Sequence, residues 1–366
     1  MSAEVILAPA TPETRRAEPS RRLAWVDAAR GYCVVAVVLF HVLSWWALSG
    51  EFDVAQRGDR FWTIVGSWLG SLRMPLLLAV SGLVMSRQVR AGLRRSTTVF
   101  RAATNAYLYV VWVAIYAVFF ALVDVDGLPH RFEGLLPTLR QVVVPGTTLW
   151  YLFALALYVP ILAALHRVPS WIVLTLLVPL SVWAHSLEVP GTFVPRVLEL
   201  TLFFAIGVYA APFLRAAAER VGVLMVAAVM VVAAGATLLG RVAEGPIGMG
   251  VLFVLRGIAF MVMAVLAVAY LSRWRLFLRL GVFLGRHTLS LYVLHPLAVY
   301  LLIAATPALA GPLGKVWESE LGAFIAPVVV VCVIVAICRL VELGTRAAQG
   351  SAIWELPPRL RARFGR

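Results

Sequence analysis

The sequence is poor in charged residues: Asp, Glu, Lys and Arg make up 14% of its 366 residues, whereas 62% are hydrophobic. A water-soluble domain of this length needs a surface rich in charge, so this composition excludes that class of protein. The mean hydropathy is +0.91, and several apolar stretches reach the length of about 20 residues that crosses a bilayer as a helix. The composition therefore indicates an integral membrane protein, with the lipid bilayer as its first partner.

Cysteine is also scarce. Cys33, Cys332 and Cys338 are odd in number, lack the spacing of metal ligands and lie in apolar stretches. This pattern predicts neither a disulfide framework nor a zinc site. We expect no metal, and we expect all three cysteines to be buried as small apolar residues.

Acidic residues are outnumbered, 18 against 32 basic ones, which gives a net charge of +14. In a soluble protein such an excess would indicate nucleic acid as a partner. In a membrane protein basic residues collect on the cytoplasmic side. No nucleic-acid partner is therefore predicted.

The apolar stretches predict an all-α integral membrane bundle of about ten transmembrane helices. The expected spans are 28–49, 63–86, 104–123, 148–165, 170–187, 196–213, 220–240, 248–271, 281–305 and 323–343. Residues 23–343 form the predicted multi-pass membrane domain. Residues 1–22 are expected to be a disordered basic tail, and 344–366 a basic cytoplasmic tail that lies on anionic lipid.

The distribution of basic residues predicts the orientation. With ten alternating spans and a cytoplasmic N-terminus, nine of the 32 basic residues fall on the far side and the other 23 on the cytoplasmic side. The nine are Arg57, Arg60, Arg73, Arg131, Arg140, Arg196, Arg241, Arg256 and Lys315. This asymmetry favours both termini in the cytoplasm.

The first predicted span carries two ionisable residues, Arg30 and His41, eleven positions apart. At about 100° per residue they project from one helix face and lie about 16 Å apart along the axis. Asp27 and Ser44 extend this polar stripe. An arginine near the cytoplasm can bind a phosphate or carboxylate, and a histidine at mid-depth can act as a base, so the pair predicts one cavity for an elongated anionic donor. The alternative is structural: a snorkelling arginine, and a histidine that hydrogen-bonds a neighbouring helix.

Two groups of arginines come next in the chain. Arg73 lies inside the second apolar stretch directly before Met74 and Pro75, where the helix loses a hydrogen bond. It is therefore a candidate to bind a substrate oxygen, or to pair with Glu199 or another buried acid. Arg87 and Arg90 follow at the end of this helix. They suit the collection of a polyanionic donor, although the preference of basic residues for the cytoplasmic side is the better explanation of them.

The later spans add further candidates. Trp150 and Tyr151 are typical of the aromatic belt at a membrane interface. Arg196 and Glu199 have the spacing of an ion pair, and with Arg256 they are either structural or line a polar cavity that faces an acceptor. 

The ninth span contains Tyr292 and His295 on one face, followed by Pro296, which should bend the helix. A single buried histidine is more often a packing residue than a catalyst. Two mid-membrane histidines in spans made of Val, Leu and Ala favour a functional role.

Four stretches resemble acyltransferase family 3, whose members O-acylate sugars and other hydroxylated acceptors. They are WVDAARGYCVVAVVLFH, LRMPLLLAVSG, LWYLFALALY and LGRHTLSLYVLHP. The first is the most specific, because the family's arginine, ten intervening residues and histidine stand here as Arg30 and His41. The match is nearest to the branch of sugar O-acetylase-like members.

The resemblance implies about ten helices with both ends cytoplasmic, in the cell inner (plasma) membrane, and a cytosolic acyl-coenzyme A donor, often acetyl-coenzyme A. It implies His41 as the essential residue, and we expect Arg73 and His295 to assist it in catalysis. Arg30, Arg87, Arg90 and Arg101 are the candidates for binding the donor. Asp27, Trp150, Glu199 and Tyr292 are the candidates for binding a sugar or glycosylated acceptor. One departure is Thr104, where the family often has a second arginine three positions after the one that stands here as Arg101.

Two other classes of protein compete with this interpretation. A transporter or flippase would line a substrate path with the same Arg, His and Glu residues, and internal inverted repeats would favour it, but none is evident. A noncatalytic scaffold would leave the phased Arg30 and His41 unexplained.

Overall fold

The computed structural model describes residues 24–50, 52–94, 96–125, 127–240, 244–348 and 350–364. Within these ranges the protein consists of helices and connections, without a strand, as the predicted all-α class requires. The predicted N-terminal tail, 1–22, lies outside the described residues.

The helices follow one another with short connections. In chain order they are α1 (Ala24–Val42), η2 (Leu43–Ala47), α2 (Gln56–Arg90), α3 (Ser96–Leu122), α4 (Leu135–Val143), α5 (Trp150–Ala164), α6 (Ser170–His185), α7 (Val194–Tyr209), α8 (Ala211–Arg220), α9 (Val223–Leu239), α10 (Gly245–Leu271), α11 (Arg275–Arg286), α12 (Thr288–Glu318), α13 (Glu320–Ala347), η3 (Ser351–Ile353) and α14 (Pro358–Phe364).

Each of the ten predicted spans coincides with an apolar helix, but the helices differ in their capacity to cross a bilayer. Six of those described are long and apolar enough, and α7 with α8, bent by 69°, makes a possible seventh. Helices α5, α6 and α9 are apolar but have only 15, 16 and 17 residues. The chain is a multi-pass membrane protein by these criteria.

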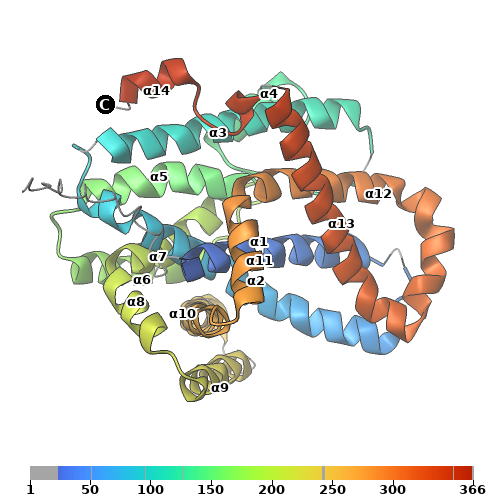
Figure 1. Ribbon diagram of the computed structural model, residues 1–366, viewed down its shortest axis with the longest axis horizontal. Coiled ribbons are helices and arrows are strands. Elements are labelled where there is room, and N and C mark those ends of the chain that lie inside the picture. The colour runs from blue at the N-terminus through green and yellow to red at the C-terminus, as the bar shows by residue number, and fades with distance from the viewer. Residues whose placement is uncertain are drawn as a thin grey trace, which may run out of the picture.

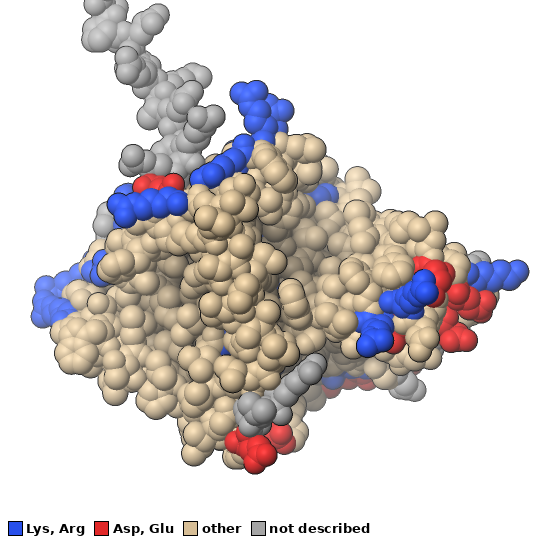
Figure 2. Space-filling model, turned by 90° about the horizontal axis from the view of Figure 1, so that it is seen from below, with Lys and Arg blue, Asp and Glu red and all other residues tan. Residues whose placement is uncertain are grey.

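The surface agrees with this class of protein. Figure 2 shows a broad uncharged area across the middle of one face, with the basic and acidic side chains gathered at its margins. Large hydrophobic side chains such as Leu122, Leu224 and Leu321 are exposed on the helices. An uncharged band of this kind lets lipid tails contact the protein without burying charge.

Helix α1 lies at the centre of the bundle, in contact with α2, α10, α11, α12 and α13 (Figure 1). Its approach to α11 is so close that a Cβ atom on Gly31 would collide with the carbonyl of Gly281, and one on Gly285 with the carbonyl of Asp27. Helices α2 and α7 pack in the same way through Gly82 and Gly207. Small residues permit such backbone contact in membrane bundles.

The structure corrects three local predictions. The longest predicted connection, 124–147, contains the amphipathic helix α4. The predicted span 281–305 is divided at His287, where α11 ends and α12 begins. Cys33 and Cys338 are buried as predicted, but Cys332 is exposed, because α13 turns that face outward from the bundle.

The segment after α13 returns to the bundle. Trp112 of α3 donates a hydrogen bond from Nε1 to the carbonyl of Ile353 at 2.9 Å, and Trp354 is buried. Helix α14 then lies beside α3 (Figure 1). At least this part of the predicted C-terminal tail packs against protein.

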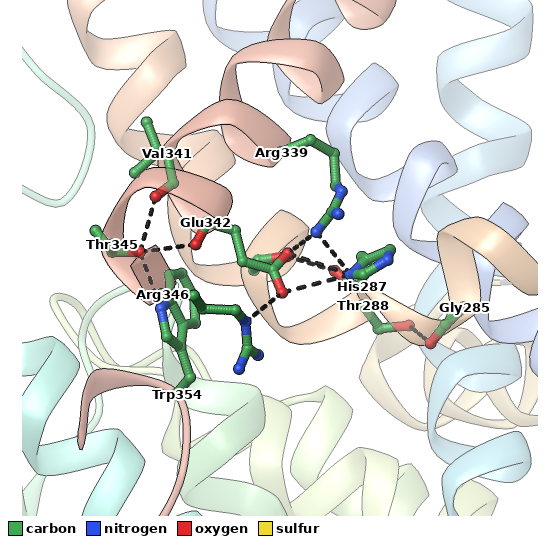
Figure 3. A network of polar contacts seen from close by, with 10 residues as sticks. Gly285, His287, Thr288, Arg339, Val341, Glu342, Thr345, Arg346 and Trp354 are labelled. Carbon is green, nitrogen blue, oxygen red and sulfur yellow. Dashed lines mark hydrogen bonds and ion pairs between the residues drawn. The ribbon is translucent and has the colours of Figure 1, made fainter. Parts of the chain in front are cut away.

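A polar network joins α12, α13 and this segment (Figure 3). The buried carboxylate of Glu342 accepts hydrogen bonds from Arg339, from Ser290 and, at 3.0 Å, from Nε of Arg346. Trp354 donates from Nε1 to Thr345 at 3.0 Å and so connects the segment to α13. Because its charges are paired with one another, we assign this network to stability.

Replacement of Glu342 with Gln should therefore destabilise the protein. Two arginines would lose their counter-charge, but Arg339 and Arg346 are 16% and 49% exposed. We expect a loss of about 2 kcal/mol, below the roughly 3–5 kcal/mol of a fully buried pair. The measurement is thermal unfolding in detergent. Glu355→Gln, which removes the exposed partner of Arg361, is the control and should leave the melting temperature unchanged.

Candidate active site

His41 lies in the last turn of α1, immediately before the helix changes type. The π-helix η2 follows, and the N–H of Leu48 donates to the carbonyl of Leu43 at 2.9 Å. Segments of π-helix are rare, and many of those that exist lie at functional sites, because the extra residue redirects the side chains around it. Here Trp45 is placed with its ring 4.2 Å from that of His41.

His41 and His295 form a hydrogen-bonded pair between α1 and α12. Nδ1 of His41 lies 2.9 Å from Nε2 of His295, and Nδ1 of His295 lies 2.8 Å from the carbonyl oxygen of Leu291. A carbonyl oxygen only accepts, so Nδ1 of a neutral His295 carries the proton and its Nε2 accepts. Nδ1 of His41 must then be the donor. Its Nε2 keeps a free lone pair.

His41, whose Nε2 is unprotonated, borders a cavity of about 320 Å³, which we call the His41 cavity. The polar and aromatic side chains that line it include those of His41, Arg73, His130, Trp150, Arg196 and Tyr292. His295 is fully buried behind His41. One histidine thus faces the cavity and the other orients it.

Arg73 brings a cation to the same cavity. Its guanidinium lies over the ring of Phe40, 3.4 Å from the centroid, and among the described residues it donates only a long hydrogen bond of 3.5 Å to the carbonyl of Leu69. The alternative pairing with Glu199 is wrong: within the described chain that carboxylate contacts Arg196 at 2.7 Å and His185 at 2.9 Å. Arg73 therefore keeps N–H donors available for a ligand.

A second cavity, of about 190 Å³, lies nearer the start of α1, and we call it the Arg30 cavity. Arg30 and Arg101 line it together with Ser81, Asn105, Tyr151 and Tyr292. The side-chain nitrogen of Asn105 is buried and has no hydrogen-bond partner in the described part of the chain. Two cations and an unused amide are groups that can bind an anionic, polar ligand.

The prediction of one cavity shared by Arg30 and His41 is wrong. They border two cavities that have Tyr292 as a common wall. The hydroxyl of Tyr292 donates to the carbonyl of Thr148 and accepts from the N–H of Tyr151 at 3.2 Å, and the hydroxyls of Tyr151 and Ser81 lie 2.7 Å apart. Side chains from α2, α5 and α12 therefore close the space between the two cavities.

The aromatic-belt interpretation of Trp150 and Tyr151 is also wrong. The two residues are only 8% and 7% exposed and line the His41 and Arg30 cavities, respectively. They turn inward because α5 packs against α2, α3 and α7.

Other predicted residues lie outside both cavities. Arg87 and Arg90 are exposed at the end of α2, and Asp27 contacts Arg30 at 3.9 Å without lining the Arg30 cavity. Glu199 is buried behind Arg196. The ion pair predicted between Arg196 and Glu199 is confirmed.

His130 is a cavity residue that the sequence analysis did not select. It lies in the connection between α3 and α4 with a left-handed backbone (φ 59°), and its ring packs against Phe193 and Trp45 at 5.0 and 5.8 Å. The only signal was a histidine in the longest polar connection. No periodicity places a loop residue over a helix.

The site and the fold define a class of protein: an all-helical, multi-pass membrane protein with a paired histidine and cations at adjoining buried cavities. Residues 23–341 match the family model described as the Acyltransferase domain, so the chain belongs to acyltransferase family 3. Comparisons with curated proteins and with solved structures give no match. The family makes this protein a membrane acyltransferase, and it favours that class over a transporter or a scaffold.

Proposed function

We propose that the protein transfers an acyl group, most simply acetyl, from acyl-coenzyme A to a hydroxyl of a sugar or glycosylated acceptor. Family membership supports acyl transfer. The observation that carries the proposal is the histidine pair, which leaves Nε2 of His41 unprotonated beside Arg73 in a cavity large enough for reacting groups. We further propose ten spans in the cell inner membrane, with both termini cytoplasmic.

The donor is proposed to enter the Arg30 cavity from the cytoplasm. Arg30 and Arg101 supply positive charge for its phosphates, and Asn105 a donor for its amide-rich arm. The thioester reaches His41 where Tyr292 separates the cavities, so the contacts of Tyr292 with Thr148 and Tyr151 open during the reaction. On this route the donor would pass beside Ser81, Tyr151 and Tyr292, which line the Arg30 cavity.

The reaction itself needs one base. Nε2 of His41 takes the proton of the acceptor hydroxyl while its oxygen bonds to the thioester carbonyl carbon. The carbon–sulfur bond breaks, and the thiolate of coenzyme A receives the proton from His41. The products are an ester and free coenzyme A, so atoms and charge balance. Transfer in two steps through an acyl group on His41 is the variant of this scheme, and labelled protein isolated without acceptor would reveal it.

Two neighbours support His41 in this scheme. Arg73 has N–H donors free to stabilise the oxyanion that forms on the thioester carbonyl. His295 accepts from Nδ1 of His41 and steadies the imidazolium ion that appears when Nε2 takes a proton. Trp150 and Tyr292 line the space beside these groups and are proposed to contact the acceptor.

Binding of labelled acetyl-coenzyme A to the purified full-length protein in lipid nanodiscs tests the donor site. Arg30→Gln and Arg101→Gln should each weaken binding about tenfold, the effect of one lost charge-assisted hydrogen bond. Arg94→Gln is the matched control, because Arg94 is exposed and outside the Arg30 cavity. Unchanged binding in both cavity variants would contradict the proposed donor site.

The same assay decides the role of Arg87 and Arg90. Both lie outside the Arg30 cavity, so Arg87→Gln and Arg90→Gln should weaken binding less than Arg30→Gln does. A weak effect that disappears in high salt would mean that they attract the donor from a distance without contacting it.

A further inference from the structure

Three arginines from three helices gather around Gly70. Arg73 of α2 lines the His41 cavity, and Arg256 of α10 lines a neighbouring cavity of about 200 Å³, which we call the side cavity. Arg196 of α7 and Gly70 line both. The side cavity therefore adjoins the His41 cavity at Gly70, a residue without a side chain.

The positive charge of these three arginines exceeds the negative charge near them. Within the described chain, Glu199 is the only carboxylate paired with any of them, at 2.7 Å from Arg196, and it is shared with His185. Among the described residues, the hydrogen bonds of Arg256 are long ones of 3.5 Å to Ser67, its guanidinium lies 5.8 Å from the centre of the Phe260 ring, and its Nε atom is buried without a hydrogen-bond partner. Three guanidinium groups thus face one carboxylate.

Unpaired cations in membrane-spanning helices are costly, and a protein that keeps them there uses them. The planar guanidinium group matches carboxylate and phosphate oxygens in particular. The donor does not satisfy this need, because its proposed cations, Arg30 and Arg101, lie across Tyr292 in the other cavity. An anionic group on the acceptor would supply the missing negative charge.

We infer that the acceptor is acidic: Arg196 and Arg256 hold a carboxylate or phosphate of the glycan in the side cavity, while a hydroxyl of the same molecule faces His41. This inference rests on the proposed acyl transfer and narrows its substrate class. The His41 cavity, of about 320 Å³, falls within the size range of small-molecule sites, and the adjoining side cavity adds about 200 Å³. Arg73 remains with the reacting oxygens.

The test compares matched acceptors with the full-length protein in nanodiscs of neutral lipid. Uronic-acid-containing oligosaccharides are supplied as the free acids and as their methyl esters, and sugar phosphates beside the unphosphorylated sugars. Release of coenzyme A from acetyl-coenzyme A reports turnover. We expect kcat/KM to be at least about tenfold higher for the acidic member of an accepted pair, the value of a charged hydrogen bond.

Arg256→Gln should remove this preference by raising KM for the acidic acceptor about tenfold and leaving that for the neutral one unchanged. Arg60→Gln is the control: Arg60 is exposed at the start of α2 and lines neither cavity. Arg256→Lys keeps the positive charge but lacks the paired N–H donors of the guanidinium group. It should therefore recover part of the preference for the acidic acceptor.

The outcomes separate the inference from the function on which it rests. Equal turnover of acidic and neutral members, or a preference that survives Arg256→Gln, overturns the acidic acceptor and leaves acyl transfer in place. An effect of Arg256→Gln that appears only when anionic lipid is added would assign the arginines to lipid headgroups and also overturns it. Failure to bind or consume acetyl-coenzyme A with any acceptor would instead refute the proposed function.

Discussion

Replacing His41 with alanine is expected to reduce kcat for acyl transfer by about 10³-fold or more, because the variant loses the group that accepts the hydroxyl proton. Nε2 of His41 is unprotonated, because Nδ1 of this ring carries the proton that it donates to His295. Both ring nitrogens of His295 already take part in hydrogen bonds. The rate of coenzyme A release, measured at saturating donor and acceptor, is the direct test.

The control is His166→Ala, since His166 is exposed after α5 and lies outside both cavities. Binding of acetyl-coenzyme A should survive in His41→Ala, because Arg30 and Arg101 line the other cavity. A folded His41→Ala protein that binds the donor and retains full activity would refute the mechanism. Loss of donor binding together with activity would indicate that the change disturbs the helix bundle.

Replacing His295 with leucine should cost about 10²- to 10³-fold in kcat, with little change in KM, because His41 loses the acceptor that fixes its tautomer. His295 does not contact the His41 cavity, so we regard it as a positioning residue. Leucine fills a similar volume but cannot accept a hydrogen bond, and Nδ1 of His41 would lose its partner at 2.9 Å.

His295→Gln separates positioning from packing. The carbonyl oxygen of a glutamine can occupy the place of Nε2 and accept from His41, so this variant should be at least about tenfold more active than His295→Leu. If the role of His295 were purely structural, His295→Leu should be more stable and more active than His295→Gln, because an apolar leucine is tolerated better in a fully buried position. Thermal unfolding of both variants beside their kcat values would decide between the two.

The sequence predicts where the apolar helices lie, because apolar length is a local property, although only six of the described helices, or seven with the bent pair α7 and α8, are long enough to cross a membrane. It also brings Arg30 and His41 onto one face of α1, since helical phase is fixed over eleven residues. It cannot tell that Tyr292 stands between them. That residue reaches the site from α12, and no spacing along the chain relates it to α1.

The same limit applies to the partners of His41. Periodicity and the cost of burying ionisable groups selected His41 and His295 separately, but the two lie 254 positions apart and meet only through the packing of α12 on α1. Trp150 and Tyr151 were misjudged because a helix end rich in aromatics looks the same at an interface and in a core. His130 was missed because its place depends on a loop that folds back over the cavity.

The glycines between α1 and α11 determine how precisely the site is built. Main chain touches main chain at Gly31 and Gly285, so the height and rotation of α1 are set by rigid peptide groups instead of by flexible side chains. Arg30 is the immediate neighbour of Gly31, and His41 follows three turns later on the same rod. Any added methyl group at this crossing would shift Arg30 and His41 together, so a substitution there should impair both the proposed donor binding and the proposed proton transfer.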